Sequence, residues 1–174
     1  EERGFFYFAE NEQDYTSWMG FGHMPKLNYG SSALRREMIE SDDSIVAYWL
    51  KPPFSADGWR VDVGNMLGRH DDHQINLELL RSIRAAVKRI SPEAYLMGEN
   101  FFEATEQLQG DGWDAVMNYT GFADPVLHWL TGYEQDALRC DAVLKTDIPW
   151  DTATMLQAWN ENLASIPWQI ALQQ

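Results

Sequence analysis

The chain has 174 residues, which is enough for one domain with a buried core. Hydrophobic residues make up 45% of it and charged residues 23%, which is ordinary for a globular protein and argues against disorder. The net charge of −14 disfavours nucleic acid and anionic membrane as partners, because phosphate contacts need clustered lysine and arginine.

The first part of the chain predicts irregular structure followed by short helices. Residues 1–30 are rich in aromatic, glycine and polar residues, with 5–8 as a candidate edge segment. A serine pair at 31–32 can cap a helical stretch that restarts near 41–43 and ends at the Pro-Pro pair 52–53. The apolar stripe of this stretch comprises Ile45, Val46, Trp49 and Leu50.

From residue 58 on, the pattern alternates between strands and helices. We expect strands at 58–63, 94–98 and 114–118, and helices near 75–90 and 103–109 with two further helical segments beyond. The helix at 75–90 ends before Pro92, and its apolar face comprises Leu79, Leu80, Ile83, Val87 and Ile90. The last helix is capped by Asp151 or Thr152, and its apolar face comprises Met155, Leu156, Trp159 and Leu163. Such alternation is typical of βαβ units in a parallel sheet.

The single cysteine and the length of the apolar runs indicate the cellular compartment in which the protein is expected. Cys140 is alone, so no internal disulfide can form and nothing implies an oxidising environment. No apolar run approaches the roughly 18 residues that span a bilayer, and no basic-then-apolar leader begins at Glu1. We therefore expect a cytoplasmic protein, unless a signal peptide precedes residue 1.

Two of the expected strands end at ionisable side chains. Arg60 and Asp62 lie two residues apart, so on a strand they point to the same face, where the guanidinium orients the carboxylate. Glu99 ends the next strand and offers a second, protonatable carboxyl. A carboxylate beside a protonatable carboxyl is the equipment for cleaving a glycosidic bond. The alternative is a structural Arg–Asp ion pair and an unrelated surface glutamate.

The segments around these groups resemble motifs of the α-amylase family of retaining glycosidases (family 13 glycoside hydrolases). Gly58-Trp59-Arg60-Val61-Asp62 is similar to the family's strand-four motif, G-[FW]-R-x-D, and Met97-Gly98-Glu99 to its strand-five motif. Met24-Pro25-Lys26-Leu27-Asn28 resembles the MPKLN signature of the neopullulanase, cyclomaltodextrinase and maltodextrin-glucosidase branch. Asn118-Tyr119 matches strand six of the same branch.

The resemblance implies an α/β fold that is a segment of a TIM (β/α)8 barrel, about strands four to six with their helices. Residues 1–30 would be the tail of an inserted loop domain, and residues 31–174 a partial catalytic barrel. The family's strand-three block is expected before residue 1, and its strand-seven block, which brings a third carboxylate, after residue 174. We therefore expect the chain alone to have little activity.

The resemblance also implies residue roles. Asp62 is expected to be the nucleophile and Glu99 the general acid/base, with Arg60 orienting the nucleophile. Gly98 is expected to leave the substrate close access to Glu99. Further substrate contacts are expected from Asn28, Asn65, Met66, Asn118 and Tyr119. For Asn28 a purely turn-forming role before Tyr29-Gly30 is the alternative.

The segment His70-Asp71-Asp72-His73 resembles a metal cluster at first sight. It precedes a helix, where polar residues cap and solvate, and no third ligand block follows at a set spacing. We expect no metal and no cofactor.

The function implied is retaining hydrolysis of α-1,4-linked glucose oligosaccharides. Neutral sugars suit the charge balance, and eight tryptophans offer stacking surfaces. Met66 places no charge where many relatives carry one, which favours the maltodextrin-glucosidase group. A transglycosylase or isomerase that uses the same two carboxyls and a non-catalytic sugar-binding relative are the alternatives.

Overall fold

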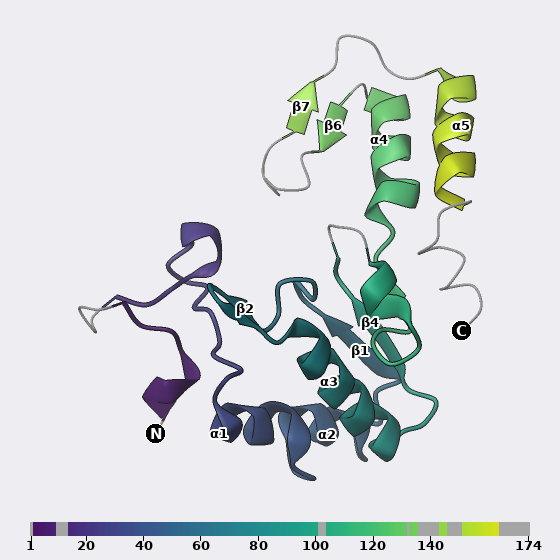
Figure 1. The fold of residues 1–174 in the computed structure, drawn as a ribbon. Helices are drawn as coiled ribbons and strands as arrows, with labels where there is room; N and C mark the ends of the chain where they lie inside the picture. Colours follow the sequence, from purple (N-terminus) through teal and green to yellow (C-terminus); the bar gives the residue numbers. More distant parts are fainter. Residues whose placement is uncertain are drawn as a thin grey trace. The chain divides into compact units, whose positions relative to one another are not determined.

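A computed structural model describes residues 2–9, 14–100, 104–131, 133–135, 143–145 and 151–163 (Figure 1). The chain divides into two compact units. Unit 1 comprises Glu1–Trp59 and Met66–Tyr95, and unit 2 comprises Arg60–Asn65 and Leu96–Gln174. Among the described residues, no helix has the length and apolarity to cross a bilayer.

Unit 1 begins with irregular structure, as expected. The short helical turns η1 (Glu2–Phe5) and η2 (Trp18–Gly20) are its first elements. Phe6 bridges to Leu27 and Phe8 to Tyr15, so the expected edge segment does pair with other backbone. The proposed domain boundary at residue 30 stays a prediction.

Serine caps begin the first helices. The Ser31 hydroxyl accepts from the Leu34 N–H (3.4 Å) at the start of α1 (Ser32–Arg35), which continues into the π-helical turn η3 (Arg36–Glu40). The second cap is Ser44, whose hydroxyl accepts from the Ala47 N–H (3.3 Å) at the start of α2 (Ile45–Leu50). This cap lies just beyond the expected position at 41–43.

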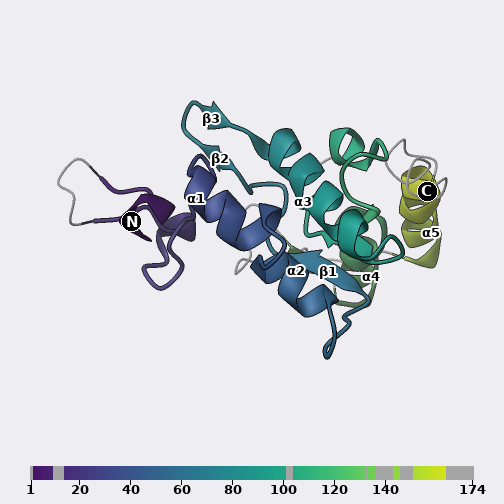
Figure 2. The ribbon, with the colours of Figure 1, turned by 90° about the horizontal axis from the view of Figure 1, so that it is seen from below.

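The apolar stripe expected on α2 is only partly correct. Leu50 is buried, but Ile45 and Trp49 are exposed, and the fully buried residue of the helix is Ala47. In unit 1, η3 and α2 both pack against α3 (Asn76–Ile90) (Figure 2). The stripe on α3 is confirmed except at Ile90, which is half-buried.

Three strands form one sheet in the order β1 (Gly58–Val61), β4 (Tyr95–Gly98) and β5 (Ala115–Val116). Figure 1 labels the first two of them. β4 and β5 pair in parallel, with Gly98 opposite Val116. Along β1, the Tyr95 N–H donates to the Asp57 carbonyl (2.8 Å) and the Glu99 N–H to that of Val61 (3.0 Å). This constant offset is the parallel pattern, so the expected βαβ alternation is confirmed and the carboxyl ends of all three strands meet.

Two short antiparallel hairpins were not expected. β2 (Arg69–His70) pairs with β3 (His73–Gln74) in unit 1, where polar residues that cap and solvate the following helix were expected. β6 (Tyr133–Gln135) pairs with β7 (Val143–Lys145) in unit 2. Paired segments of two or three residues are too short to show a period-two pattern.

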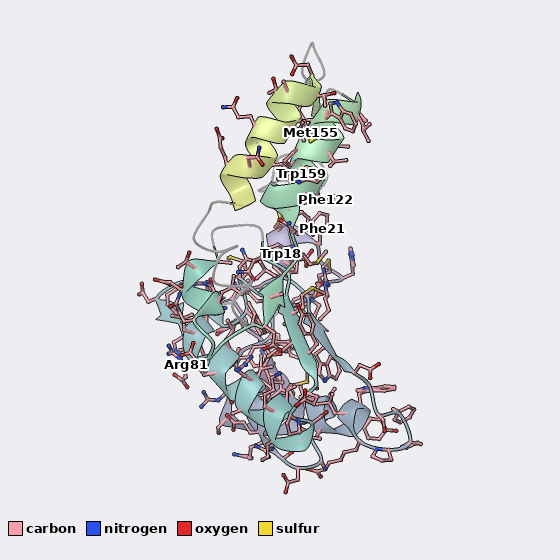
Figure 3. All side chains as sticks on the ribbon, turned by 90° about the vertical axis from the view of Figure 1, so that its right-hand side faces the viewer. Trp18, Phe21, Arg81, Phe122, Met155 and Trp159 are labelled. Atoms are coloured by element: carbon pink, nitrogen blue, oxygen red, sulfur yellow. The ribbon has the colours of Figure 1, made fainter. Side chains whose placement is uncertain are left out.

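Helical segments complete unit 2. They are the turns η4 (Thr105–Leu108) and η5 (Tyr119–Ala123) and the helices α4 (Asp124–Thr131) and α5 (Thr152–Leu163). Phe122, Met155 and Trp159 lie side by side where η5, α4 and α5 meet (Figure 3), with 5.7 Å between the two ring centroids. Leu156, expected on the apolar face of α5, is exposed, whereas Met155 is buried.

The expected cap at Asp151 is confirmed, and it makes the start of α5 pH-sensitive. The carboxylate accepts from the Thr154 N–H (2.7 Å), and its hydrogen bonds from Thr154 lower the pKa of Asp151 below its ordinary value of 3.8. A folded-state pKa below the unfolded one means that the cap stabilises fully above about pH 4 and is lost as the pH falls through the lowered pKa.

We predict that Asp151→Ala raises amide hydrogen exchange in the first turn of α5 above about pH 4, where the cap is formed, and that the difference from the wild type disappears as the pH falls through the lowered pKa. Asp151→Asn should keep the protection, because asparagine caps helices about as well, and should remove its decline on acidification. Exchange measured from pH 6 to pH 2 checks this. An equal acid-induced decline in Asp151→Asn would contradict the role of the carboxylate.

Candidate active site

Asp62 directly follows β1, and Arg60 is the third residue of that strand. The Arg60 Nη1 donates to the Asp62 Oδ1, as their i, i+2 spacing on a strand predicts. The Asp62 side chain is 67% exposed. Its carboxylate is therefore oriented by the guanidinium while remaining accessible to a solute.

Glu99 directly follows β4, at the matching end of the neighbouring strand. Its Oε2 lies 2.8 Å from the Arg60 Nη2, and its side chain is only 11% exposed. One guanidinium thus contacts both carboxyl groups. The parallel pairing of β1 and β4 brings these two sequence-predicted residues together at one edge of the sheet.

Two further donors hold Glu99. The Val63 backbone N–H donates to the Oε2 (2.9 Å), and the Tyr119 hydroxyl donates to the Oε1 (2.8 Å). Tyr119 was expected to contact substrate, and in the structure it contacts the candidate acid/base. Each carboxyl oxygen of Glu99 therefore has a polar partner, which is what burial of this group requires.

Val63 is a residue that sequence reasoning missed. Its φ of +46° lies in the left-handed region, where a β-branched residue is a genuine outlier. Such a conformation costs on the order of 1–3 kcal/mol and occurs mainly at functional sites. Here it ends β1 at Val61, earlier than the expected residue 63, and turns the Val63 N–H toward Glu99.

Arg60 stays protonated and positively charged. Partial burial lowers the pKa of the guanidinium, but the hydrogen bond to Asp62 and the charges of Glu99 and Asp62 outweigh this and raise the pKa above its ordinary value. Arg60 Nη2 also lies 3.5 Å from the Met117 sulfur. A permanent cation between the carboxyls reduces the repulsion that two neighbouring anions would otherwise have.

Gly98 also has an unexpected role in packing. A Cβ added at Gly98 would lie 2.3 Å from the Trp113 Nε1, so the missing side chain makes room for an indole ring. The space left by the missing side chain is thus taken by Trp113, and close access of substrate to Glu99 stays a prediction. The signal in the sequence would have been the pairing of this glycine with a tryptophan before the next strand.

The other expected substrate contacts are placed as follows. Asn65 is buried, and its backbone N–H donates to the Glu99 carbonyl (3.4 Å). Asn118 is half-buried and directly precedes Tyr119 in unit 2. Met66 belongs to unit 1. Contacts of these three residues with substrate stay a prediction.

Asn28 also belongs to unit 1, and there it forms a turn. Its Oδ1 accepts from the Gly30 N–H (3.0 Å), and its amide nitrogen donates to the Gly4 carbonyl (3.3 Å). The turn-forming alternative is thus supported by these contacts, and a contact of Asn28 with substrate stays a prediction.

The two histidines of the 70–73 segment take part in packing. The His70 ring stacks on Tyr7 with 3.8 Å between centroids, and the His73 ring lies beside Gly30. Within the described part of the chain, no group of three His, Cys, Asp or Glu side chains is arranged to hold a metal ion. Cys140 lies outside the described residues.

Comparison with known proteins identifies relatives. Residues 3–173 match the model of the alpha amylase catalytic domain. A cyclomaltodextrinase of Geobacillus thermopakistaniensis is 34% identical over 129 residues, which are 74% of this chain and 20% of that protein. An intracellular maltogenic amylase of Bacillus subtilis is 28% identical over 132 residues, which are 76% of this chain and 20% of that protein. The chain thus spans about a fifth of the length of these two relatives.

Solved structures show the same relationship. The debranching enzyme of Nostoc punctiforme superposes with a TM-score of 0.71 at 28% identity, covering 95% of this chain and 33% of that one. The cyclic alpha-maltosyl-(1→6)-maltose hydrolase of Arthrobacter globiformis gives a TM-score of 0.68 at 26% identity, covering 94% of this chain and 32% of that one. The three parallel strands and their helices are accordingly a segment of a TIM-barrel catalytic domain, and the chain belongs to the alpha-amylase family.

Proposed function

We propose that the protein carrying this chain is a retaining glycoside hydrolase that acts on α-glucans. One observation carries the proposal: the Arg60 guanidinium contacts both Asp62 and Glu99 at the carboxyl ends of neighbouring parallel strands. In barrels of this kind, catalytic groups occupy that end of the strands. Two carboxyls that share one cation lie near each other, as the double displacement of retaining glycosidases requires.

Asp62 is the nucleophile in this proposal. It attacks the anomeric carbon while the bond from that carbon to the leaving oxygen breaks, and Glu99 gives its proton to that oxygen. The glycosyl ester on Asp62 is then attacked by water, whose proton returns to Glu99 as the ester bond breaks. Accessibility supports the assignment, because Asp62 is 67% exposed whereas the side chain of Glu99 is only 11% exposed.

The contacts of Glu99 suggest which oxygen carries the proton. Oε2 accepts from Arg60 and Val63, and neither donor can accept a proton in return. Oε1 faces the Tyr119 hydroxyl, which can donate to a bare oxygen and accept from a protonated one. We therefore assign the transferable proton to Oε1, with Tyr119 as its partner in both protonation states.

The substrate class rests on the resemblance and on the relatives. Among the similar proteins are a cyclomaltodextrinase and a maltogenic amylase, and the Arthrobacter neighbour is a hydrolase of cyclic alpha-maltosyl-(1→6)-maltose. Short α-1,4-linked maltodextrins are our proposed substrates. Transglycosylation by the same two carboxyls is the alternative outcome, decided by whether water or a sugar attacks the ester.

A cytoplasmic location stays a prediction, which the name of the intracellular maltogenic amylase supports.

Replacing either carboxyl should abolish turnover. We predict that Asp62→Asn lowers kcat of the full-length protein on maltotriose by several orders of magnitude, because an amide cannot form the glycosyl ester. Glu99→Gln should lose far less in kcat/KM on an aryl glucoside with a good leaving group, because formation of the ester then needs no protonation, whereas kcat should still fall for want of a base in the second step. Asp57→Asn and Glu93→Gln are matched controls, since both residues are exposed and lie outside the site. Near-normal activity of Asp62→Asn would rule out the mechanism.

We expect the Tyr119 hydroxyl to increase kcat without being essential for catalysis. Tyr119→Phe removes one hydrogen bond to Glu99, and bonds to charged groups contribute about 1.5–3 kcal/mol, so we expect kcat to fall about tenfold to a hundredfold. Tyr95→Phe, an exposed tyrosine at the start of β4, is the control and should be neutral. Steady-state kinetics on maltotriose checks both variants, and equal kcat values would contradict the proposed role.

Substrate length is a separate prediction. We expect kcat/KM to be higher for maltotriose than for soluble starch, because Met66 offers no charged group to a long chain and the MPKLN-type block resembles a branch that handles small glucans. The ratio of the two kcat/KM values reports differential transition-state binding. A clear preference for starch would assign the protein to the ordinary amylases.

A further inference from the structure

Trp113 has no part in the mechanism above, yet it lies directly behind the site. It is completely buried in unit 2 and precedes Asp114 and β5. Its indole contacts two glycines, Gly98 and Gly64. Gly98 directly precedes Glu99, and Gly64 follows Asp62 by two positions, so one ring touches both backbone segments that carry the carboxyls.

The contact with Gly98 leaves no spare room. A Cβ there would lie 2.3 Å from the Trp113 Nε1, 2.5 Å from the Cε2 and 2.7 Å from the Cδ1. A Cβ at Gly64 would lie 2.9 Å from the Cζ2 of the same ring and 3.4 Å from the Gly98 Cα. The indole therefore fills the space that side chains at both positions would need.

Hydrogen bonds hold the backbone of Trp113 and of the residue after it. The backbone N–H of Trp113 donates to the Gln107 carbonyl (2.9 Å), and a Cβ at Gly112 would lie 2.3 Å from that same oxygen. The next residue, Asp114, is tied to β4 twice. Its N–H donates to the Leu96 carbonyl (2.8 Å), and its Oδ2 accepts from the Leu96 N–H (2.9 Å).

The shape of the indole matters more than its polarity. The Trp113 Nε1 is buried and has no hydrogen-bond partner among the described residues. A buried N–H without a partner is unfavourable, and an apolar side chain would avoid that penalty. A wide, flat, rigid ring is what distinguishes tryptophan from the apolar alternatives here.

We propose that Trp113 is a positioning residue whose indole sets the spacing between the backbone of Asp62 and that of Glu99. The inference rests on the proposed function, since spacing matters only if both carboxyls act on one bond. Retaining glycosidases hold their carboxyls about 5–5.5 Å apart and inverting ones about 6.5–9.5 Å. The range for retention is narrow, so a small shift of either backbone segment would impair the reaction.

A double-mutant cycle in the full-length protein tests this. Trp113→Val removes all three indole atoms that crowd Gly98, and Gly98→Ala adds the methyl that those atoms exclude. We expect each single variant to lower kcat on maltotriose by tenfold or more with KM changed less than threefold, and the acid and base limbs of the pH–rate profile to move. The double variant should recover at least tenfold over Gly98→Ala, because the shorter side chain accommodates the methyl.

Leu80→Ala is the matched control, because Leu80 is equally buried but lies on α3 in unit 1. It should lower the melting temperature while leaving kcat and the pH–rate profile unchanged. Variants of Trp113 and Gly98 that behave like Leu80→Ala, or a double variant without recovery, would overturn the positioning role. A wild-type protein without α-glucan hydrolysis would instead overturn the proposed function and the inference with it.

Discussion

The site depends on the contact of one guanidinium, that of Arg60, with two carboxyl groups. This guanidinium reaches Asp62 along its own strand and Glu99 on the neighbouring strand. Without this cation, two carboxyl groups would meet at the sheet edge with one of them buried, and like charges at short range oppose each other's ionisation. The parallel pairing of β1 and β4 makes the shared contact possible, because it aligns the two strand ends.

The two carboxyls differ in their surroundings, and the difference matches two chemical tasks. Asp62 is open to solvent and is held from one side by Arg60, which suits a group that must reach the anomeric carbon. Glu99 is nearly enclosed and is held by a guanidinium, a backbone N–H and a hydroxyl. A group that must give and take back one proton at a fixed point benefits from such a rigid setting.

The sequence predicted the positions of the candidate residues better than the contacts that hold them. Arg60, Asp62 and Glu99 could be predicted because motif and strand periodicity place them at matching ends. Val63 and Trp113 could not, because one acts through an unusual backbone angle and the other through the fit of a ring against two glycines. Hydrophobicity also predicted the wrong buried face for α2, where the small Ala47 is buried while Trp49 is exposed. The hairpins β2–β3 and β6–β7 escaped prediction because their strands are too short to carry a pattern.

The most direct test of the account is to trap the glycosyl ester. A 5-fluoro-α-glucosyl fluoride forms this ester but slows its hydrolysis, so the full-length protein should retain one sugar that peptide mass spectrometry can locate. We expect the label on Asp62, and none on Glu99, because the exposed carboxylate is the one that can reach the anomeric carbon. A label on Glu99, or on a residue outside the Arg60 site, would contradict the assignment of the two carboxyls.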